Sequence, residues 1–167
     1  MRHVLFDTNV LLDVLLERNP FYRLSGLALS RVDGRLVQRD VSAHAIATIV
    51  YIADKSLPLK DARRKTELLC AHLKIAGATD QVVRKAFLSP IGGFEDAMTH
   101  AAAEASHCRL IVTRKTADFA KGSIRSFWKL PADHEPVSSP AACLRIGFIK
   151  VCCKARESAV PVILRKG

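Results

Sequence analysis

Three aspartates that lie far apart in the sequence are the main candidates for chemistry: Asp7, Asp96 and Asp118. Asp7 follows an apolar run at residues 4–6, Asp96 opens a helical segment after a glycine loop, and Asp118 follows a second apolar run at residues 110–112. In a parallel α/β sheet the carboxyl ends of the strands meet at one edge, where ligands bind. Clustered carboxylates repel one another unless a cation neutralises them, and oxygen ligands suit Mg²⁺ or Mn²⁺. We therefore expect a divalent metal site at this edge, with these three aspartates as candidate ligands.

Asp7 also has a plain structural interpretation. Apolar residues resume at helical spacing directly after Asp7-Thr8-Asn9, which indicates that a helix begins there. Asp7 could simply cap this helix, and Thr8 or Asn9 could also cap its first turn. These residues alone leave both roles open, and the choice depends on whether other acids converge on Asp7.

The elements that must position these acids alternate along the chain. Strand-like segments lie at residues 4–6, 36–41, 74–78 and 110–112, and segments with helical periodicity lie between them. This alternation predicts an α/β fold, namely a three-layer α/β/α sandwich with a central, mainly parallel sheet. Beyond Pro131 the pattern weakens, and we expect an extended segment at residues 136–140 and a short turn of helix at residues 141–145.

The composition bounds the partners and the compartment. The chain has 167 residues and a formal net charge of +10, and such a surface attracts polyanions, most often nucleic acid. Its five cysteines are irregularly spaced without a CxxC pair, which favours reduced thiols over a disulfide framework or a zinc site. The sequence shows no signal peptide and no apolar stretch of membrane-spanning length. We therefore expect a cytoplasmic protein with no membrane partner.

Several short motifs occur together in the order and spacing of a known family. They are Asp-Thr-Asn-Val-Leu-Leu-Asp at residues 7–13, Arg-Asn-Pro-Phe at 18–21, Ser-Ala at 42–43, Phe-Glu-Asp-Ala at 94–97, Val-Thr-Arg at 112–114 and Asp-Phe at 118–119. Over residues 2–144 the chain resembles the PIN domain family, and within it the VapC-like toxin ribonucleases. The resemblance implies a PIN-like nuclease domain at residues 1–145 and leaves residues 146–167 as an extension of unknown role.

The same resemblance implies a function and partners. It implies an endoribonuclease that depends on Mg²⁺ or Mn²⁺ and hydrolyses RNA phosphodiester bonds. It also implies the toxin of a toxin-antitoxin pair, with an antitoxin protein as partner, and a homodimer.

The family site contains four acids, and this sequence matches only two of them. Asp7 and Asp96 occupy the first and third positions, whereas Thr48 falls at the second and Lys115 at the fourth. Each lost carboxylate lowers the expected affinity for the ion. The Lys115 ammonium either points away from the site or competes with the ion for the same carboxylates.

Two further acids lie close enough to the motif positions to compensate. Asp118 is a candidate ligand or water-orienting base, and with Asp7 and Asp96 it completes the predicted catalytic set. Glu95 is a possible contributor, but adjacent residues on a helix point about 100° apart, which directs it away from Asp96.

The polar residues around the acids are predicted to position them or to bind substrate. Thr8 or Asn9 would position Asp7 or the phosphate, and Thr113 would contact substrate or support the acids. Arg114 and Lys115 would contact phosphate groups, which weakens binding as salt rises.

The remaining charged candidates are interpreted as surface residues with no part in the site. Asp13 and Glu17 continue one face of the first helix, which predicts a solvated polar face. Four histidines lack metal-ligand spacing and are predicted to lie at the surface: His44, His72, His100 and His107.

Two functions therefore remain open from the sequence. The first is a metal-dependent PIN-type endoribonuclease. The second, motivated by Thr48 and Lys115, is a catalytically impaired PIN domain that binds RNA or a protein partner without cleavage.

Overall fold

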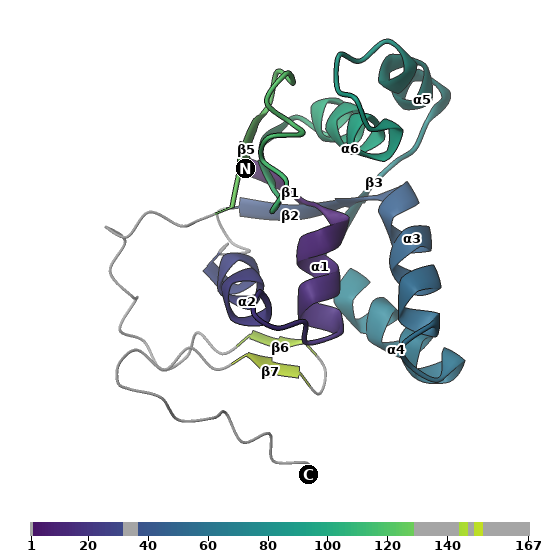
Figure 1. Cartoon of the computed structure of the whole chain (residues 1–167), viewed down its shortest axis with the longest axis vertical. Helices are drawn as coiled ribbons and strands as arrows, with labels where there is room; N and C mark the ends of the chain where they lie inside the picture. Colours follow the sequence, from purple (N-terminus) through teal and green to yellow (C-terminus); the bar gives the residue numbers. More distant parts are fainter. Residues whose placement is uncertain (1, 32–36, 129–143, 147–148, 152–167) are drawn as a thin grey trace.

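The computed structural model describes residues 2–31, 37–128, 144–146 and 149–151 (Figure 1). The helices within these ranges are α1 (Thr8–Leu15), α2 (Tyr22–Arg31), α3 (Ala43–Asp54), α4 (Leu59–Cys70), α5 (Asp80–Phe87) and α6 (Phe94–Ala105). The strands are β1 (Arg2–Phe6), β2 (Val37–Ser42), β3 (Lys74–Ala76), β4 (Cys108–Val112), β5 (Arg125–Phe127), β6 (Leu144–Ile146) and β7 (Ile149–Val151).

The first five strands form one sheet in the order β3-β2-β1-β4-β5, and each neighbouring pair is parallel. Phe6 at the end of β1 lies opposite Val112 at the end of β4. The next residue continues this pairing, because the Asp7 N–H donates to the Val112 carbonyl at 3.0 Å. The sheet therefore brings Asp7 and the residues that follow β4 to the same edge.

Helices cover both faces of the sheet, with α1 to α4 on one face and α5 and α6 on the other (Figure 1). Side chains along a strand alternate between the two faces. Val4 and Phe6 of β1 accordingly pack with α1 to α4, whereas Leu5 packs with α5 and α6, and all three are buried. The predicted three-layer α/β/α sandwich with a parallel sheet is confirmed.

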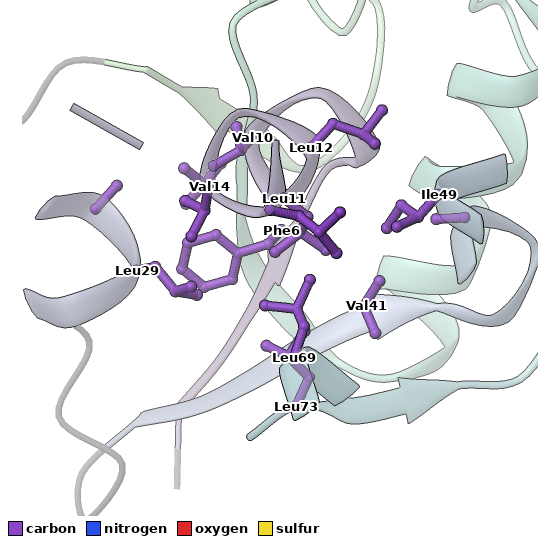
Figure 2. Packing of buried hydrophobic residues seen from close by; sticks show 14 of the residues in the cluster. Phe6, Val10, Leu11, Leu12, Val14, Leu29, Val41, Ile49, Leu69 and Leu73 are labelled. Atoms are coloured by element: carbon purple, nitrogen blue, oxygen red, sulfur yellow. The ribbon is translucent and has the colours of Figure 1, made fainter. Parts of the chain in front are cut away.

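The larger hydrophobic cluster fixes α1 against the sheet and against α3 (Figure 2). Phe6, Leu11, Val14 and Ile49 in this cluster are at most 1% exposed. Full burial of an aliphatic or aromatic side chain contributes about 1.5–3 kcal/mol. The start of α1, and with it Asp7, is therefore positioned by the packing of a complete helix.

Two short strands depart from the sequence-based expectation. β5 was not predicted, because its three residues form no apolar run and are exposed or half-buried; it joins the sheet by pairing with the end of β4. Residues 144–146 form β6, so the turn of helix predicted at residues 141–145 is wrong for its last two residues. The extended segment predicted at residues 136–140 lies outside the described residues.

β6 and β7 form an antiparallel hairpin, and β7 lies against α2. The predicted boundary between domain and extension falls inside β6, and that division of the chain stays a prediction. In the described part of the chain, none of the helices has the length and apolar character needed to span a membrane.

Shortening a core side chain of α1 should destabilise the domain strongly. Leu11 is fully buried, so Leu11→Ala should lower the free energy of unfolding by about 2–5 kcal/mol, from lost burial and the cavity left behind. Leu88→Ala is the matched control, because Leu88 is 86% exposed, and it should change stability by less than about 0.5 kcal/mol. Urea denaturation followed by circular dichroism measures both, and equal midpoints for the two variants would contradict the packing described here.

Candidate active site

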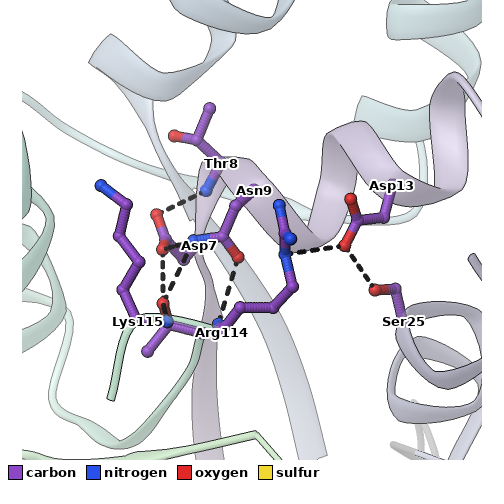
Figure 3. Close-up of polar contacts among 8 residues, drawn as sticks. Asp7, Thr8, Asn9, Asp13, Ser25, Arg114 and Lys115 are labelled. Carbon is purple, nitrogen blue, oxygen red and sulfur yellow. Dashed lines mark hydrogen bonds and ion pairs between the residues drawn. The ribbon is translucent and has the colours of Figure 1, made fainter. Parts of the chain in front are cut away.

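The Asp7 carboxylate lies at the end of β1 with both oxygens occupied by hydrogen bonds (Figure 3). Its Oδ1 accepts from the Thr8 backbone N–H at 2.6 Å, which makes Asp7 the N-cap of α1. Its Oδ2 accepts from the Asn9 amide at 2.5 Å and from the Thr113 hydroxyl at 2.6 Å. One oxygen of Asp7 therefore caps α1, and the other links the start of α1 to Thr113 after β4; the role of Asp7 in an acidic site stays a prediction.

Asn9 and Thr113 also join the loop after β4 to the start of α1 (Figure 3). The Asn9 amide nitrogen lies 3.3 Å from the Thr113 hydroxyl, and the Asn9 side-chain oxygen accepts from the Arg114 backbone N–H at 3.2 Å. The Lys115 backbone N–H donates to the Thr113 hydroxyl at 3.0 Å. These bonds position Asp7 and fix the backbone from which the Lys115 side chain leaves.

Asp96 lies in the first turn of α6, opposite the loop after β4. Its Oδ2 is 3.7 Å from the Lys115 ammonium. Gly93, the N-cap of α6, leaves room for this carboxylate, since a Cβ at that position would lie 2.9 Å from Asp96 Oδ2. The glycine loop that precedes α6 thus lets Asp96 turn back toward the start of its own helix.

The charges of these groups influence one another. Burial raises the pKa of Asp7 above the ordinary carboxyl range; the hydrogen bond from Thr113 opposes this rise, and the negative charge of Asp96 adds to it. Burial also raises the pKa of Asp96, where the Lys115 ammonium opposes the rise and the charges of Asp118 and Glu95 add to it. A cation close to Asp7 and Asp96 would relieve the repulsion between them.

The other predicted site residues differ in their exposure and in their contacts with Asp7 and Asp96. Asp118 and Glu95 are exposed and reach Asp96 through their charges. The Thr8 hydroxyl is buried and has no hydrogen-bond partner among the described residues. Thr48, at the position where the family carries an acid, donates its hydroxyl to the His44 carbonyl on its own helix at 3.4 Å.

Asp13 is a buried residue, and the prediction of a solvated polar face at this position is wrong. Its Oδ2 accepts from the Ser25 hydroxyl at 2.9 Å and lies 3.1 Å from Nε of Arg114 (Figure 3). The Arg114 guanidinium also stacks 4.1 Å from the centre of the Phe21 ring. The side chain of Arg114 is therefore engaged by Asp13 of α1 and by Phe21.

Two of the four histidines predicted to lie at the surface are enclosed. His100 is buried in α6, where its Nε2 accepts from the Ile124 backbone N–H at 3.2 Å. His44 is half-buried between α3 and α6, with Nδ1 2.8 Å from the Ser42 hydroxyl and Nε2 3.3 Å from the Thr99 hydroxyl. Burial lowers the pKa of both histidines, which favours the neutral imidazole. Only the fold reveals these contacts, because no ligand-like spacing marks them in the sequence.

The acids present can hold a hard divalent cation only with few protein ligands. Within the described ranges, no three residues among histidine, cysteine, aspartate and glutamate come together as a ligand set. Mg²⁺ keeps several waters and is commonly bound through one or two carboxylates together with substrate phosphates. Asp7 and Asp96, with oxygen donors and raised pKa values, fit this mode.

A family model described as PIN domain matches residues 3–117, which is more than half of the chain. This chain is a PIN domain. Among curated protein sequences, none matches it. Members of the PIN family are generally nucleases, and they generally use divalent metal ions.

Solved structures show the same fold at low sequence identity. A VapBC2 structure from Rickettsia felis, bound to a DNA fragment from its promoter, is similar with a TM-score of 0.57 and 15% identity, over 75% of this chain and 97% of that one. FitAcB from Neisseria gonorrhoeae is similar with a TM-score of 0.59 and 18% identity, over 74% of this chain and 96% of that one. A toxin-antitoxin complex from Klebsiella pneumoniae has a TM-score of 0.57 and 23% identity, over 70% of this chain and 90% of that one. At this identity the likeness is one of fold.

Removing the charge of Asp96 should stabilise the metal-free PIN domain. The raised pKa means that the ionised form is disfavoured in the folded state, and this destabilisation is present above the folded-state pKa and lost below the ordinary carboxyl range. Asp96→Asn should therefore raise the melting temperature at pH 7 by about 1–3 °C, and the gain should shrink as the pH falls through that window. Thermal denaturation in EDTA, beside Asp54→Asn at an exposed position of α3, measures this. A lower melting temperature at neutral pH would contradict it.

Asp13 and Arg114 should depend on each other energetically. Asp13→Ala leaves the Arg114 guanidinium and the Ser25 hydroxyl without their carboxylate partner, which should cost about 1–3 kcal/mol of stability. The Asp13→Ala/Arg114→Ala double variant should lose less than the sum of the single variants, by about 0.5 kcal/mol or more. Urea denaturation of all four proteins gives the coupling, and additive losses would show that the pair does not interact.

Proposed function

We propose that this PIN domain is a divalent-metal-dependent endoribonuclease that acts as the toxin of a toxin-antitoxin pair. The observation that carries the proposal is the pair of carboxylates with raised pKa values, Asp7 and Asp96, at the carboxyl edge of a PIN fold. Their oxygen atoms suit Mg²⁺ or Mn²⁺, and the basic net charge of +10 suits a polyanionic substrate.

In this proposal the chain's own residues hold and orient the reacting groups. Asp7 and Asp96 are the ligands, and Asn9 and Thr113 fix the orientation of the Asp7 carboxylate through their hydrogen bonds. A divalent ion held by these carboxylates would supply Lewis-acid chemistry, which favours ionisation of an attacking water and counters the charge on the scissile phosphate. Asp118, which is exposed and whose charge acts on Asp96, is the proposed proton acceptor for an attacking water or a third carboxylate ligand.

The two basic residues in the loop after β4 are proposed to have different roles. Lys115 is the proposed phosphate contact, because its ammonium is half-exposed beside Asp96. Arg114, whose guanidinium lies against Asp13 and Phe21, is proposed as a residue that holds the loop in place. Thr8 and Asn9 belong to the proposed substrate-binding edge, and Thr48 and Glu95 are proposed to have no direct part in the chemistry.

The proposed partners are RNA, an antitoxin protein and a second copy of this chain. The antitoxin is supported by the similar structure from K. pneumoniae, which is a toxin-antitoxin complex. We place the protein in the cytoplasm, where an RNA substrate would be met, and sedimentation of the purified chain measures the proposed dimer.

Cleavage of a mixed RNA pool in Mn²⁺ tests the proposal. Wild-type protein should cleave the RNA. Asp7→Asn and Asp96→Asn should each lower the cleavage rate by more than about 100-fold, which exceeds the 10–100-fold loss typical of residues that only orient a ligand. Thr113→Val should fall within that smaller range, because it removes one hydrogen bond to Asp7 and leaves the carboxylate. Asp54→Asn, exposed on α3, is the matched charge control and should cleave like wild type.

Two results would contradict the proposal in different ways. Equal cleavage by wild type, Asp7→Asn and Asp96→Asn would show that the activity comes from elsewhere. Absence of cleavage by folded wild-type protein in saturating Mn²⁺, with RNA binding retained, would favour a PIN domain that binds RNA without cutting it.

A further inference from the structure

A cationic side chain, Lys115, lies beside the acidic pair formed by Asp7 and Asp96. Its ammonium lies 3.7 Å from Asp96 Oδ2, within ion-pair distance, and its charge also acts on Asp7. A unit positive charge thus already lies beside Asp96 and acts on Asp7, the two carboxylates that the proposed function assigns to the metal. The sequence left open whether this side chain points away, and the structure places it toward the acids.

The backbone of Lys115 is fixed, whereas its ammonium can move. The Lys115 N–H is anchored by the Thr113 hydroxyl, which itself is bonded to Asp7. The Lys115 side chain is 54% exposed and carries its charge on a flexible four-carbon stem. It can therefore approach Asp96 in one state and extend into solvent in another, at little conformational cost.

We propose that the Lys115 ammonium is a built-in competitor of the divalent ion for Asp96 and Asp7. This inference rests on the metal site of the proposed function. In the metal-free protein the ammonium partly neutralises the two carboxylates. A divalent ion that binds there displaces it, because two cations so close together repel each other. The chain should therefore bind Mn²⁺ more weakly than its two carboxylates alone would.

A second consequence concerns the metal-free fold. Without the ammonium, the charges of Asp7, Asp96 and Asp118 repel one another with less compensation. Neutralising Lys115 should therefore lower the melting temperature in EDTA, by about 1–3 °C for a chain of this size, and added Mn²⁺ should restore it. Neutralising a solvated lysine elsewhere should do neither.

Mn²⁺ binding to the full-length chain, followed by electron paramagnetic resonance of free Mn²⁺, tests the inference without any RNA. Lys115→Gln should bind Mn²⁺ about tenfold more tightly than wild type, the effect of one nearby charge worth ~1.4 kcal/mol. Lys121→Gln, an exposed lysine in the same loop region, is the matched control and should change the Kd less than twofold (about the scatter expected of a screened surface charge). Combining Lys115→Gln with Asp96→Asn should remove the gain.

The outcomes separate this inference from the proposed function. Equal Mn²⁺ affinities of wild type and Lys115→Gln, or an equal gain in Lys121→Gln, would overturn the competitor role whether or not RNA is cleaved. The absence of Mn²⁺ binding by every variant would also overturn it. A gain specific to Lys115→Gln supports it, even if the Mn²⁺-loaded protein leaves RNA intact and the proposed nuclease activity fails.

Discussion

The geometry of the carboxyl edge depends on the burial of one charge, the Asp7 carboxylate at the end of β1. Taking an ionised carboxylate out of water is unfavourable unless hydrogen bonds replace its hydration. Here the replacement comes from the start of α1, through Thr8 and Asn9, and from the end of β4, through Thr113. Of the bonds that offset the desolvation of Asp7, the one from Thr113 also joins two segments more than a hundred residues apart. Burial and the charge of Asp96 nevertheless raise the pKa of Asp7, so a nearby positive charge would favour its ionised form.

The fold follows from the sequence wherever a pattern is long enough to carry it. The apolar run before Asp7 and the helical spacing after it identify β1 and α1, and the alternation of such segments gives the sandwich. The sequence does not predict β5, because a three-residue strand at the edge of a sheet is defined by its hydrogen-bonded partner, β4, rather than by its own apolar residues. Local patterning contains no information about such a pairing.

The site is less fully determined by the sequence, and Asp13 shows why. Its spacing from Asp7 places it on α1, but the spacing does not say which neighbour covers that face. Burial of Asp13 depends on α2, which brings Ser25, and on the loop after β4, which brings Arg114. These partners are distant in sequence and chemically ordinary, so only the packed structure reveals the ion pair. The sequence correctly indicates that Asp7 follows a strand and that Asp96 lies near the start of a helix, and their shared role as metal ligands stays a prediction.

The three residues after β4 show how one short segment serves both the site and the core. The chain leaves β4 at Val112 and bends at Arg114. Thr113 contacts Asp7 and Lys115 lies beside Asp96, whereas Arg114 between them contacts Asp13 and Phe21. Two adjacent basic residues, equivalent by composition, thereby acquire different electrostatic surroundings. Arg114 is held by a buried carboxylate and an aromatic ring, and it stabilises the loop in one position. Lys115 has its backbone N–H bonded to Thr113 and its ammonium beside Asp96, so the proposed affinity of the acidic pair for other cations depends on where that side chain lies.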